Sequence, residues 1–310
     1  MSLATIIVNR RSGSAGGAAD DLAKSLTARL ADQGVEAVSI PFDARGRRPG
    51  VWRTRLMARL DEGAERAYVL GGDGTVLAVA GALLRRGVAL GIVPLGTANL
   101  LARDLGIPLD PERAIAALAS AKIHSIDVGR VNGELFLCAS MLGVSTALSR
   151  TREAARGVGV LRLWGRVARK GLLLLGRFPY WRVTLDLDGR LETLHTRAMV
   201  ITNNPVKAEP GLYPSRERLD LGRLGVYGVH KGPLWELTRL ALRLVNGGWP
   251  QEPRIFHYSV RQLTIAAGGR HRVTVMNDGE RRRMTLPLRY ELLPAVLPVL
   301  MPTEQGEGRG

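Results

Sequence analysis

The chain has 310 residues, of which 45% are hydrophobic, so it is long and apolar enough to form two domains with buried cores. Its 44 basic and 28 acidic side chains give a formal net charge of +16, and such a surface attracts phosphates, nucleic acid or acidic lipid. The single cysteine, Cys138, excludes an intrachain disulfide framework, and the first apolar run is too short for a signal peptide. Since no stretch of about 18 residues is apolar and free of charge, we expect a cytoplasmic protein without a membrane-spanning helix.

The first third of the chain alternates between strand and helix patterns. Residues 4–9 are typical of a buried strand, and they precede a glycine-rich loop and a helix over 18–33. The same order recurs at 67–74, before a helix over 75–86, and at 89–96, before a helix that starts at Asn99. This alternation predicts an α/β domain over 1–123, with a parallel, Rossmann-like sheet covered by helices on both faces.

The pattern changes after about residue 124. Residues 124–285 contain alternating, strand-like segments separated by glycine-rich turns, which predicts an antiparallel β-sandwich. Helical patterns interrupt it at 147–177 and 233–246. The apolar, proline-rich residues 286–302 are predicted to form a last strand that returns to the first domain, followed by a disordered tail.

Much of the positive charge is local. Between Arg150 and Arg182 there are eight Arg and one Lys against one acid, Glu153. Basic and apolar side chains are interleaved in the helical insertion 147–177, which suits an anionic membrane surface, and an amphipathic helix packed on the sandwich explains the pattern equally well. Nucleic acid is a rival partner for the charge, but no motif for reading it is present, so we expect no specific nucleic acid partner.

A glycine-rich loop stands where an apolar run becomes a helical pattern, at Gly71, Gly72, Asp73, Gly74 and Thr75. Glycines let backbone amides approach phosphate oxygens, and a helix N-terminus favours an anion. The acid can hold a metal ion or a hydroxyl, and the threonine suits a cap. A tight turn capped by the acid explains one glycine better than three, so we interpret the loop as a phosphate site, although it matches neither a P-loop nor a dinucleotide fingerprint.

A second loop repeats this arrangement within residues 94–106. Gly96 and Thr97 follow a predicted strand, Asn99 opens a helix, and Arg103 lies one turn further. Neighbouring loops of a parallel sheet can face one cleft, so the two loops are predicted to form one site.

Four segments in this order, "NRRSG" at 9–13, "GGDGT" at 71–75, "PLGTANLLARDLG" at 94–106 and "NDGE" at 277–280, resemble the diacylglycerol kinase and sphingosine kinase catalytic-domain superfamily. The resemblance spans nearly the whole chain. It implies a phosphofructokinase-like nucleotide-binding domain, a β-sandwich lipid-substrate domain, and ATP with Mg²⁺. It also implies that a basic residue of the first loop, Arg10 or Arg11, helps to hold the phosphates. The expected nucleotide contacts are Asn9, Arg10, Arg11, Ser12, Gly71, Gly72, Gly74, Thr75, Gly96, Thr97 and Asn99.

The resemblance also implies the catalytic residues. Asp278 corresponds to the general base, Glu280 to a metal ligand, and Asp73 to a catalytic acid linked to the metal. By local pattern alone, "NDG" is a strong hairpin turn, and this alternative reading stays open.

The sequence departs from the family pattern at two positions. Asp220 and Gly222 match an acidic turn that helps to bind a structural metal in the family, but Leu221 replaces its second acid. A magnesium ion held by fewer carboxylates binds more weakly. Leu100 stands where many members carry an acid or a histidine. These departures leave room for altered substrate choice or a weakened enzyme, but they do not affect "GGDGT" or "NDGE".

We therefore predict an ATP-dependent lipid kinase that converts diacylglycerol to phosphatidic acid, a reaction of phospholipid biosynthesis. The alternatives are an NAD kinase-like enzyme and a lipid- and nucleotide-binding regulatory protein without turnover. We expect a peripheral membrane protein whose lipid substrate lies at an anionic membrane surface, with a homodimer as a possible state.

Overall fold

The structure is a computed structural model that describes residues 2–12, 18–43, 50–143, 180–207, 215–216, 218–231 and 253–303. The predicted helical segments at 147–177 and 233–246 and the tail after residue 303 lie outside these residues. The chain divides into two compact units, which we describe separately. Unit 1 comprises Met1–Ile126 and Ala295–Gly310, and unit 2 comprises Asp127–Pro294.

Unit 1 contains a parallel sheet with the strand order β2-β1-β3-β4-β15. Strands β1, β3 and β4 are apolar and largely buried, as expected where helices cover both faces, whereas β2 at the edge of the sheet is mostly exposed. The parallel sheet predicted from the strand and helix alternation is therefore confirmed. The strands are β1 (Ser2–Val8), β2 (Val35–Pro41), β3 (Ala64–Gly71), β4 (Ala89–Pro94) and the end of β15 (Leu288–Met301).

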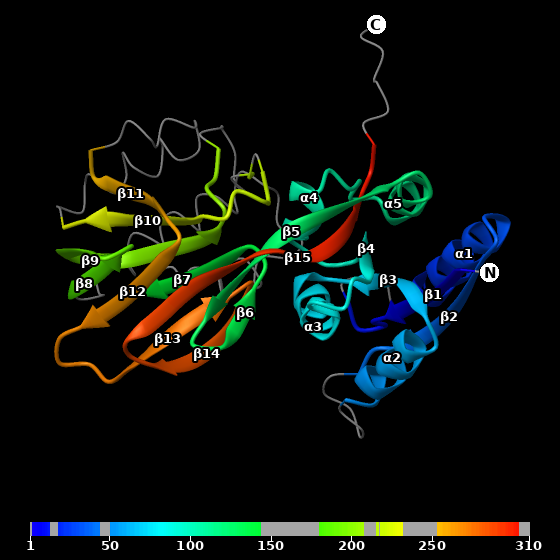
Figure 1. Cartoon of the computed structure of the whole chain (residues 1–310), viewed down its shortest axis with the longest axis horizontal. Helices are drawn as coiled ribbons and strands as arrows, with labels where there is room; N and C mark the ends of the chain where they lie inside the picture. The colour runs from blue at the N-terminus through cyan, green and yellow to red at the C-terminus, as the bar shows by residue number, and fades with distance from the viewer. Residues whose placement is uncertain are drawn as a thin grey trace, which may run out of the picture. The chain divides into compact units, whose positions relative to one another are not determined.

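The helices of unit 1 lie on the two faces of this sheet (Figure 1). Leu22, Leu26 and Leu30 recur at helical spacing in α1, and they pack with α5 and with Tyr68 in one hydrophobic cluster. Helices α2 and α3 contact β3 and its neighbours. The helices are α1 (Ala18–Asp32), α2 (Val51–Asp61), α3 (Asp73–Leu83), α4 (Leu100–Asp104) and α5 (Pro111–Leu118).

Two predicted helix boundaries were displaced. Helix α3 begins at Asp73 rather than at Thr75, because Gly72 adopts an extended conformation and forms the N-cap. It ends at Leu83 rather than at Arg86, and Arg85 adopts a left-handed conformation that stops the helix. The acid of the "GGDG" loop therefore lies in the first turn of the helix, where the helix dipole stabilises a negative charge.

The strand order places the predicted loops together. Strands β1 and β3 are neighbours although β2 lies between them in the sequence, so the order reverses at this point. The loops at 9–12, 71–75 and 95–99 follow the carboxyl ends of β1, β3 and β4, which are adjacent in the sheet. Ligands of open α/β sheets bind outside the carboxyl ends of strands at such a reversal.

Unit 2 is built from antiparallel strands in the order β14-β13-β7-β9-β8-β12-β15, with β10 beside β9 and β11. Its buried side chains form one cluster, which includes Phe136, Leu185, Ile201 and Tyr290. The predicted antiparallel β-sandwich is confirmed. The remaining strands are β5 (Lys122–Val131), β6 (Glu134–Phe136), β7 (Ala139–Gly143), β8 (Trp181–Leu187), β9 (Arg190–Asn203), β10 (Leu224–His230), β11 (Ile255–Val260), β12 (Gln262–Ala267), β13 (Arg272–Asn277) and β14 (Glu280–Thr285).

The last strand serves both units. Leu288 to Glu291 of β15 pair antiparallel with β12 in unit 2, whereas Val299 pairs parallel with Leu90 in unit 1. The predicted returning segment, 286–302, therefore begins in the β-sandwich and enters unit 1 only at Ala295. Among the described residues no helix is both long and apolar enough to cross a membrane.

Candidate functional site

Asn9 connects the first loop to the start of helix α3. Its backbone N–H donates to the carbonyl of Leu70 at the end of β3, and its side-chain Nδ2 donates to Thr75 Oγ1 at 2.7 Å. Its Oδ1 accepts the N–H of Arg11 at 3.0 Å. Thr75 is buried, so the amide fixes the turn after β1 against the first turn of α3.

The other residues of the first loop differ in whether their side chains already have partners. Arg10 forms an ion pair with Asp20 at 2.9 Å. Within the described part of the chain, the exposed Arg11 guanidinium makes no ion pair. Ser12 is buried, and its Oγ donates to the carbonyl of Leu95 at 3.4 Å. Of the two arginines that the sequence offered for phosphate binding, Arg10 is paired with Asp20, whereas Arg11 has no ion pair with the described residues.

The second and third loops touch through their glycines. A Cβ added to Gly72 would lie 3.0 Å from Gly96 Cα, and one added to Gly96 would lie 2.7 Å from Gly72 Cα. A Cβ on Gly71 would lie 2.8 Å from the Cβ of Thr75. Real Cβ atoms essentially never approach as closely as at Gly71 and Gly96, so these two positions require glycine, whereas a Cβ at Gly72 would fit only if the neighbouring backbone shifted by a few tenths of an ångström. Gly74 lies in the first turn of α3 and is partly exposed.

Asp73 joins the same two loops through its carboxylate. Its oxygens accept the N–H groups of Asn99 at 2.9 Å and Leu100 at 2.7 Å, which are the N-cap and the first residue of α4. Burial raises the pKa of Asp73, and the two amides oppose this rise. The acid predicted to act with a metal thus also caps the neighbouring helix.

Asn99 shapes the third loop locally. It adopts a left-handed conformation, its Oδ1 accepts the N–H of Gly96 at 2.9 Å, and its Nδ2 donates to the Gly96 carbonyl at 3.0 Å. Thr97 is exposed between them. Thr97 is therefore presented on a loop that Asn99 and Asp73 hold from two sides.

Asp278 occupies a tight turn in unit 2 between β13 and β14. Asp278 and Gly279 both have positive φ, 46° and 90°, as in the type I′ hairpin that the "NDG" pattern predicted. The carboxylate accepts the N–H groups of Leu137, Cys138 and Ala139, the last two at 2.9 Å. The residue is thus both a turn residue and a partly buried acid held by three successive amides.

The surroundings of Asp278 have opposing effects on its charge. Burial raises the pKa of the carboxyl group, whereas the three amides and the positive charge of Arg216 lower it. The neighbouring Asn277 side chain is 2% exposed, and its amide has no partner among the described residues. A buried amide without a partner is unusual and leaves hydrogen-bonding capacity next to the acid.

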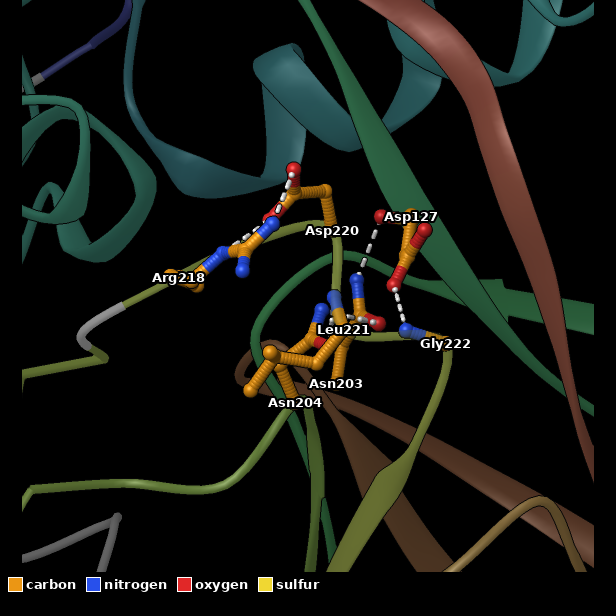
Figure 2. A network of polar contacts seen from close by, with 7 residues as sticks. All are labelled: Asp127, Asn203, Asn204, Arg218, Asp220, Leu221 and Gly222. Atoms are coloured by element: carbon orange, nitrogen blue, oxygen red, sulfur yellow. Dashed lines mark hydrogen bonds and ion pairs between the residues drawn. The ribbon is translucent and has the colours of Figure 1, made fainter.

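Two of the predicted metal ligands are paired with arginines. Glu280 accepts from Arg282 at 2.8 Å. Asp220 forms hydrogen bonds of 2.9 and 3.0 Å with Arg218, and Figure 2 shows the two side chains facing each other. Among the described residues, no group of three or more His, Cys, Asp or Glu could hold a metal ion. The metal roles of Asp73, Glu280 and Asp220 therefore stay predictions.

The turn around Leu221 is fixed by direct hydrogen bonds (Figure 2). The N–H of Leu221 donates to Asn204 Oδ1 at 2.9 Å, and the N–H of Gly222 donates to Asp127 Oδ2 at 2.7 Å. Asn203 Nδ2 donates to the carbonyl of Asp127 at 2.6 Å. This polar network includes Asp127 and Asn203, which the sequence analysis did not select.

A further residue that sequence reasoning missed is Arg216. It is 6% exposed, and its Nη1 donates to the carbonyls of Leu137 at 2.8 Å and Asn203 at 2.7 Å. Its Nη2 lies 3.4 Å from Cys138 Sγ. Nothing in the polar segment around this arginine distinguishes it from the many exposed arginines of the chain.

Comparison with known families covers both units. Residues 3–131 match the model of the diacylglycerol kinase catalytic domain, and residues 151–301 match that of the YegS C-terminal NAD kinase beta sandwich-like domain. The first match covers most of unit 1 and ends five residues inside unit 2, and the second covers most of unit 2 and includes the part of β15 that belongs to unit 1.

Individual relatives agree with these models. A diacylglycerol kinase of Mycobacterium tuberculosis is 34% identical over 96% of this chain and 94% of its own length. A diacylglycerol kinase of Bacillus subtilis is 28% identical over 76% of this chain and 78% of its own. A crystal structure of a diacylglycerol kinase from Bacillus anthracis shares the fold, with a TM-score of 0.69, 17% identity and coverage of 97% and 96% of the two chains. The chain thus belongs to the diacylglycerol kinase family of lipid kinases.

Proposed function

We propose that the protein transfers the γ-phosphoryl group of ATP to the hydroxyl of diacylglycerol, which yields phosphatidic acid and ADP. The observation that carries this proposal is the set of three loops at the carboxyl ends of β1, β3 and β4, tied together by Asn9, Asp73 and the Gly72–Gly96 contact. Relatives that are named diacylglycerol kinase support the choice of acceptor.

The loops suit the phosphates of a nucleotide. Helix α3 begins directly after β3, so its first backbone N–H groups and the positive end of its dipole lie at the reversal in strand order. Arg11 supplies a cation that is not paired within the described residues, and Thr97 supplies an exposed hydroxyl. Together these groups can neutralise and orient an anion with several oxygens.

Magnesium fits this site only with help from the nucleotide. Mg²⁺ binds through one or two carboxylates together with substrate phosphates, and Asp73 is the carboxylate at the loops. Each carboxylate oxygen keeps acceptor capacity beyond the one amide that it receives. Mg²⁺ would supply charge neutralisation of the phosphates, and the metal role of Glu280 in unit 2 stays a prediction.

Asp278 is the proposed general base. The lipid hydroxyl oxygen forms the new bond to the γ-phosphorus, the bond to ADP breaks, and the hydroxyl proton passes to the Asp278 carboxylate. Burial raises the pKa of this acid, which makes the carboxylate a better proton acceptor. Three amides hold it in one orientation, as positioning of a base requires.

The lipid acceptor requires access to a membrane surface. Strand β14 exposes Arg281, Arg282 and Arg283 at an edge of the sheet, and the basic segment 147–177 adds charge outside the described residues. We propose peripheral binding to anionic lipid, which flotation with phosphatidylserine vesicles at low and high salt tests. Light scattering of the purified protein tests the expected homodimer.

A radiolabel assay tests the function. The protein is incubated with γ-labelled ATP, Mg²⁺ and vesicles that contain diacylglycerol, and the lipids are separated by thin-layer chromatography. Labelled phosphatidic acid from the wild type and none from Asp278→Asn is the expected result. If the label appears only in the product of a different lipid, that lipid is the acceptor instead of diacylglycerol.

A second candidate is an NAD kinase-like enzyme, which the description of the matched C-terminal family favours. NAD is therefore offered as an acceptor in parallel. Nucleotide binding measured by calorimetry, without label transfer to any lipid or to NAD, would instead support a regulatory protein that lacks turnover.

A further inference from the structure

Arg216 is a buried cation whose hydrogen bonds converge on the segment that holds Asp278. It is 6% exposed, so its guanidinium has lost most of its hydration and needs strong acceptors. It finds them in the carbonyls of Leu137 and Asn203, at 2.8 and 2.7 Å. The first of these belongs to residues 137–139, whose N–H groups bind the acid, and we call these residues the strap.

One peptide group connects the cation directly to the acid. The carbonyl of Leu137 and the N–H of Cys138 belong to the same planar unit. The carbonyl accepts from Arg216 Nη1 at 2.8 Å, and the N–H donates to Asp278 Oδ1 at 2.9 Å. Because hydrogen bonds in a chain polarise one another, the guanidinium strengthens the amide that holds the carboxylate.

The next peptide group is fixed through Asn203. The backbone N–H of Asn203 donates to the Cys138 carbonyl at 3.0 Å. The Ala139 N–H, which shares a peptide group with that carbonyl, donates to Asp278 Oδ1 at 2.9 Å. Arg216 binds the Asn203 carbonyl at 2.7 Å, so it holds the end of β9 as well as the strap. Two of the three peptide groups that orient Asp278 are therefore linked to Arg216, one directly and one through Asn203, whose Nδ2 also donates to the Leu137 carbonyl at 3.1 Å.

We infer that Arg216 is a positioning residue: it fixes the orientation of the strap and thereby aims the Asp278 carboxylate at the hydroxyl to be phosphorylated. This inference rests on the proposed function, because it takes Asp278 to be the general base. Arg216 itself touches neither substrate nor reacting atoms in this scheme.

The test compares Arg216→Met with Arg218→Met. Methionine fills much of the volume of the arginine stem but cannot donate a hydrogen bond. Arg218 lies two residues away, is exposed and pairs with Asp220, so its variant is the matched control for the loss of one arginine. Arg216→Lys keeps the charge and one direction of donation, and it serves as the conservative variant.

In the kinase assay, Arg216→Met is expected to lower kcat about 30-fold to 100-fold, because a misplaced catalytic group costs up to about that factor. The KM for ATP should change less than about two-fold, since the nucleotide loops belong to unit 1. Arg216→Lys should restore part of kcat, and Arg218→Met should match the wild type. A parallel rise in the KM for ATP, or an equal loss of kcat in the control, would overturn the inference.

A second measurement does not depend on activity. Cys138 is the single cysteine of the chain, is 7% exposed and lies in the strap, so the rate of its reaction with a colorimetric disulfide reagent reports on strap order. The rate should rise at least about ten-fold in Arg216→Met and stay at the wild-type value in Arg218→Met, because opening the strap exposes the thiol. If Arg216→Met does not fold by circular dichroism, Arg216→Lys decides the same comparison.

The two measurements separate two failures. A wild type that labels no acceptor ends the proposed function, and the thiol rates still decide whether Arg216 holds the strap. An active wild type with unchanged kcat or thiol rate in folded Arg216→Met ends the positioning role alone.

Discussion

Asp73 and Asp278 are held in the same way but by different parts of the sequence. Each follows a strand, and each carboxylate accepts successive backbone N–H groups. The amides that bind Asp73 come from the next loop of the same sheet, 26 and 27 residues later. Those that bind Asp278 come from the strap, about 140 residues earlier, and Arg216 lies behind them. A short motif can therefore specify the first acid, whereas the second also needs long-range packing.

The largest effect is expected from Asp278→Asn, which replaces the carboxylate that the strap holds. Loss of general-base catalysis typically costs 10² to 10⁴-fold, so we expect the rate of lipid phosphorylation to fall about 1000-fold. The amide also keeps only one acceptor oxygen and turns an NH₂ group toward the strap N–H that the other oxygen had bound, which costs about 1–3 kcal/mol of stability. Initial rates and calorimetric ATP affinity check this. A variant that keeps more than about a tenth of the rate would remove Asp278 from the role of base.

The second-largest effect is expected from Gly96→Ala, which disrupts the contact between the two loops around Asp73. The added Cβ would lie 2.7 Å from both Gly72 Cα and Asn99 Oδ1, so the loops must separate. We expect weaker ATP binding and a loss of about 1–3 kcal/mol in the free energy of unfolding, as in other overpacked sites. Gly268→Ala is the control, because a Cβ there meets nothing within 4 Å. Equal effects of the two variants on ATP affinity would contradict a contact between the loops.

An intermediate effect is expected from Asp73→Ala. The variant leaves the N–H groups of Asn99 and Leu100 without their acceptor, and loss of such a cap costs about 0.5–2 kcal/mol. ATP affinity should fall because the third loop loosens and the proposed Mg²⁺ ligand is lost, whereas the thiol rate of Cys138 should not change, since the strap belongs to unit 2. Urea denaturation and calorimetry measure both effects. An increased thiol rate would show that the two aspartate sites are not independent.

The smallest effect is expected from Asp220→Asn. An exposed ion pair such as that between Asp220 and Arg218 contributes about 0–1 kcal/mol, so the melting temperature and activity should barely change. Thermal melts with and without EDTA sharpen this prediction. A drop in melting temperature on adding EDTA that is absent in Asp220→Asn would assign a structural metal to this turn.

The sequence predicted the order of strands and helices in unit 1 and the loops that follow them, because buried parallel strands and glycine loops leave local patterns. It could not show why Gly96 must be glycine and why Gly72 has so little room for a side chain, since both depend on the contact between two loops. The start of α3 was misplaced by two residues because the N-cap is Gly72, whose preference for caps is weak.

Unit 2 was less accessible to the same reasoning. "NDG" predicted the hairpin turn, but the three amides around Asp278 and the buried Arg216 come from segments distant in the sequence. A buried arginine has no local signature in a chain with 44 basic residues. The family resemblance identified the acid, and packing alone identified its support.

The shared strand β15 affects how the protein can be made. Residues 127–294 must leave the ribosome before Ala295 and the residues that follow can pair with β4, which at about 5–20 residues per second takes about 10–30 s. During this delay β4 forms an unprotected edge of the sheet in the nascent unit 1, and this edge is open to wrong pairing. Unit 1 is the first to be translated, but its sheet can be completed only after the last strand has been synthesised. Expression of residues 1–126 alone is therefore expected to give an aggregation-prone fragment.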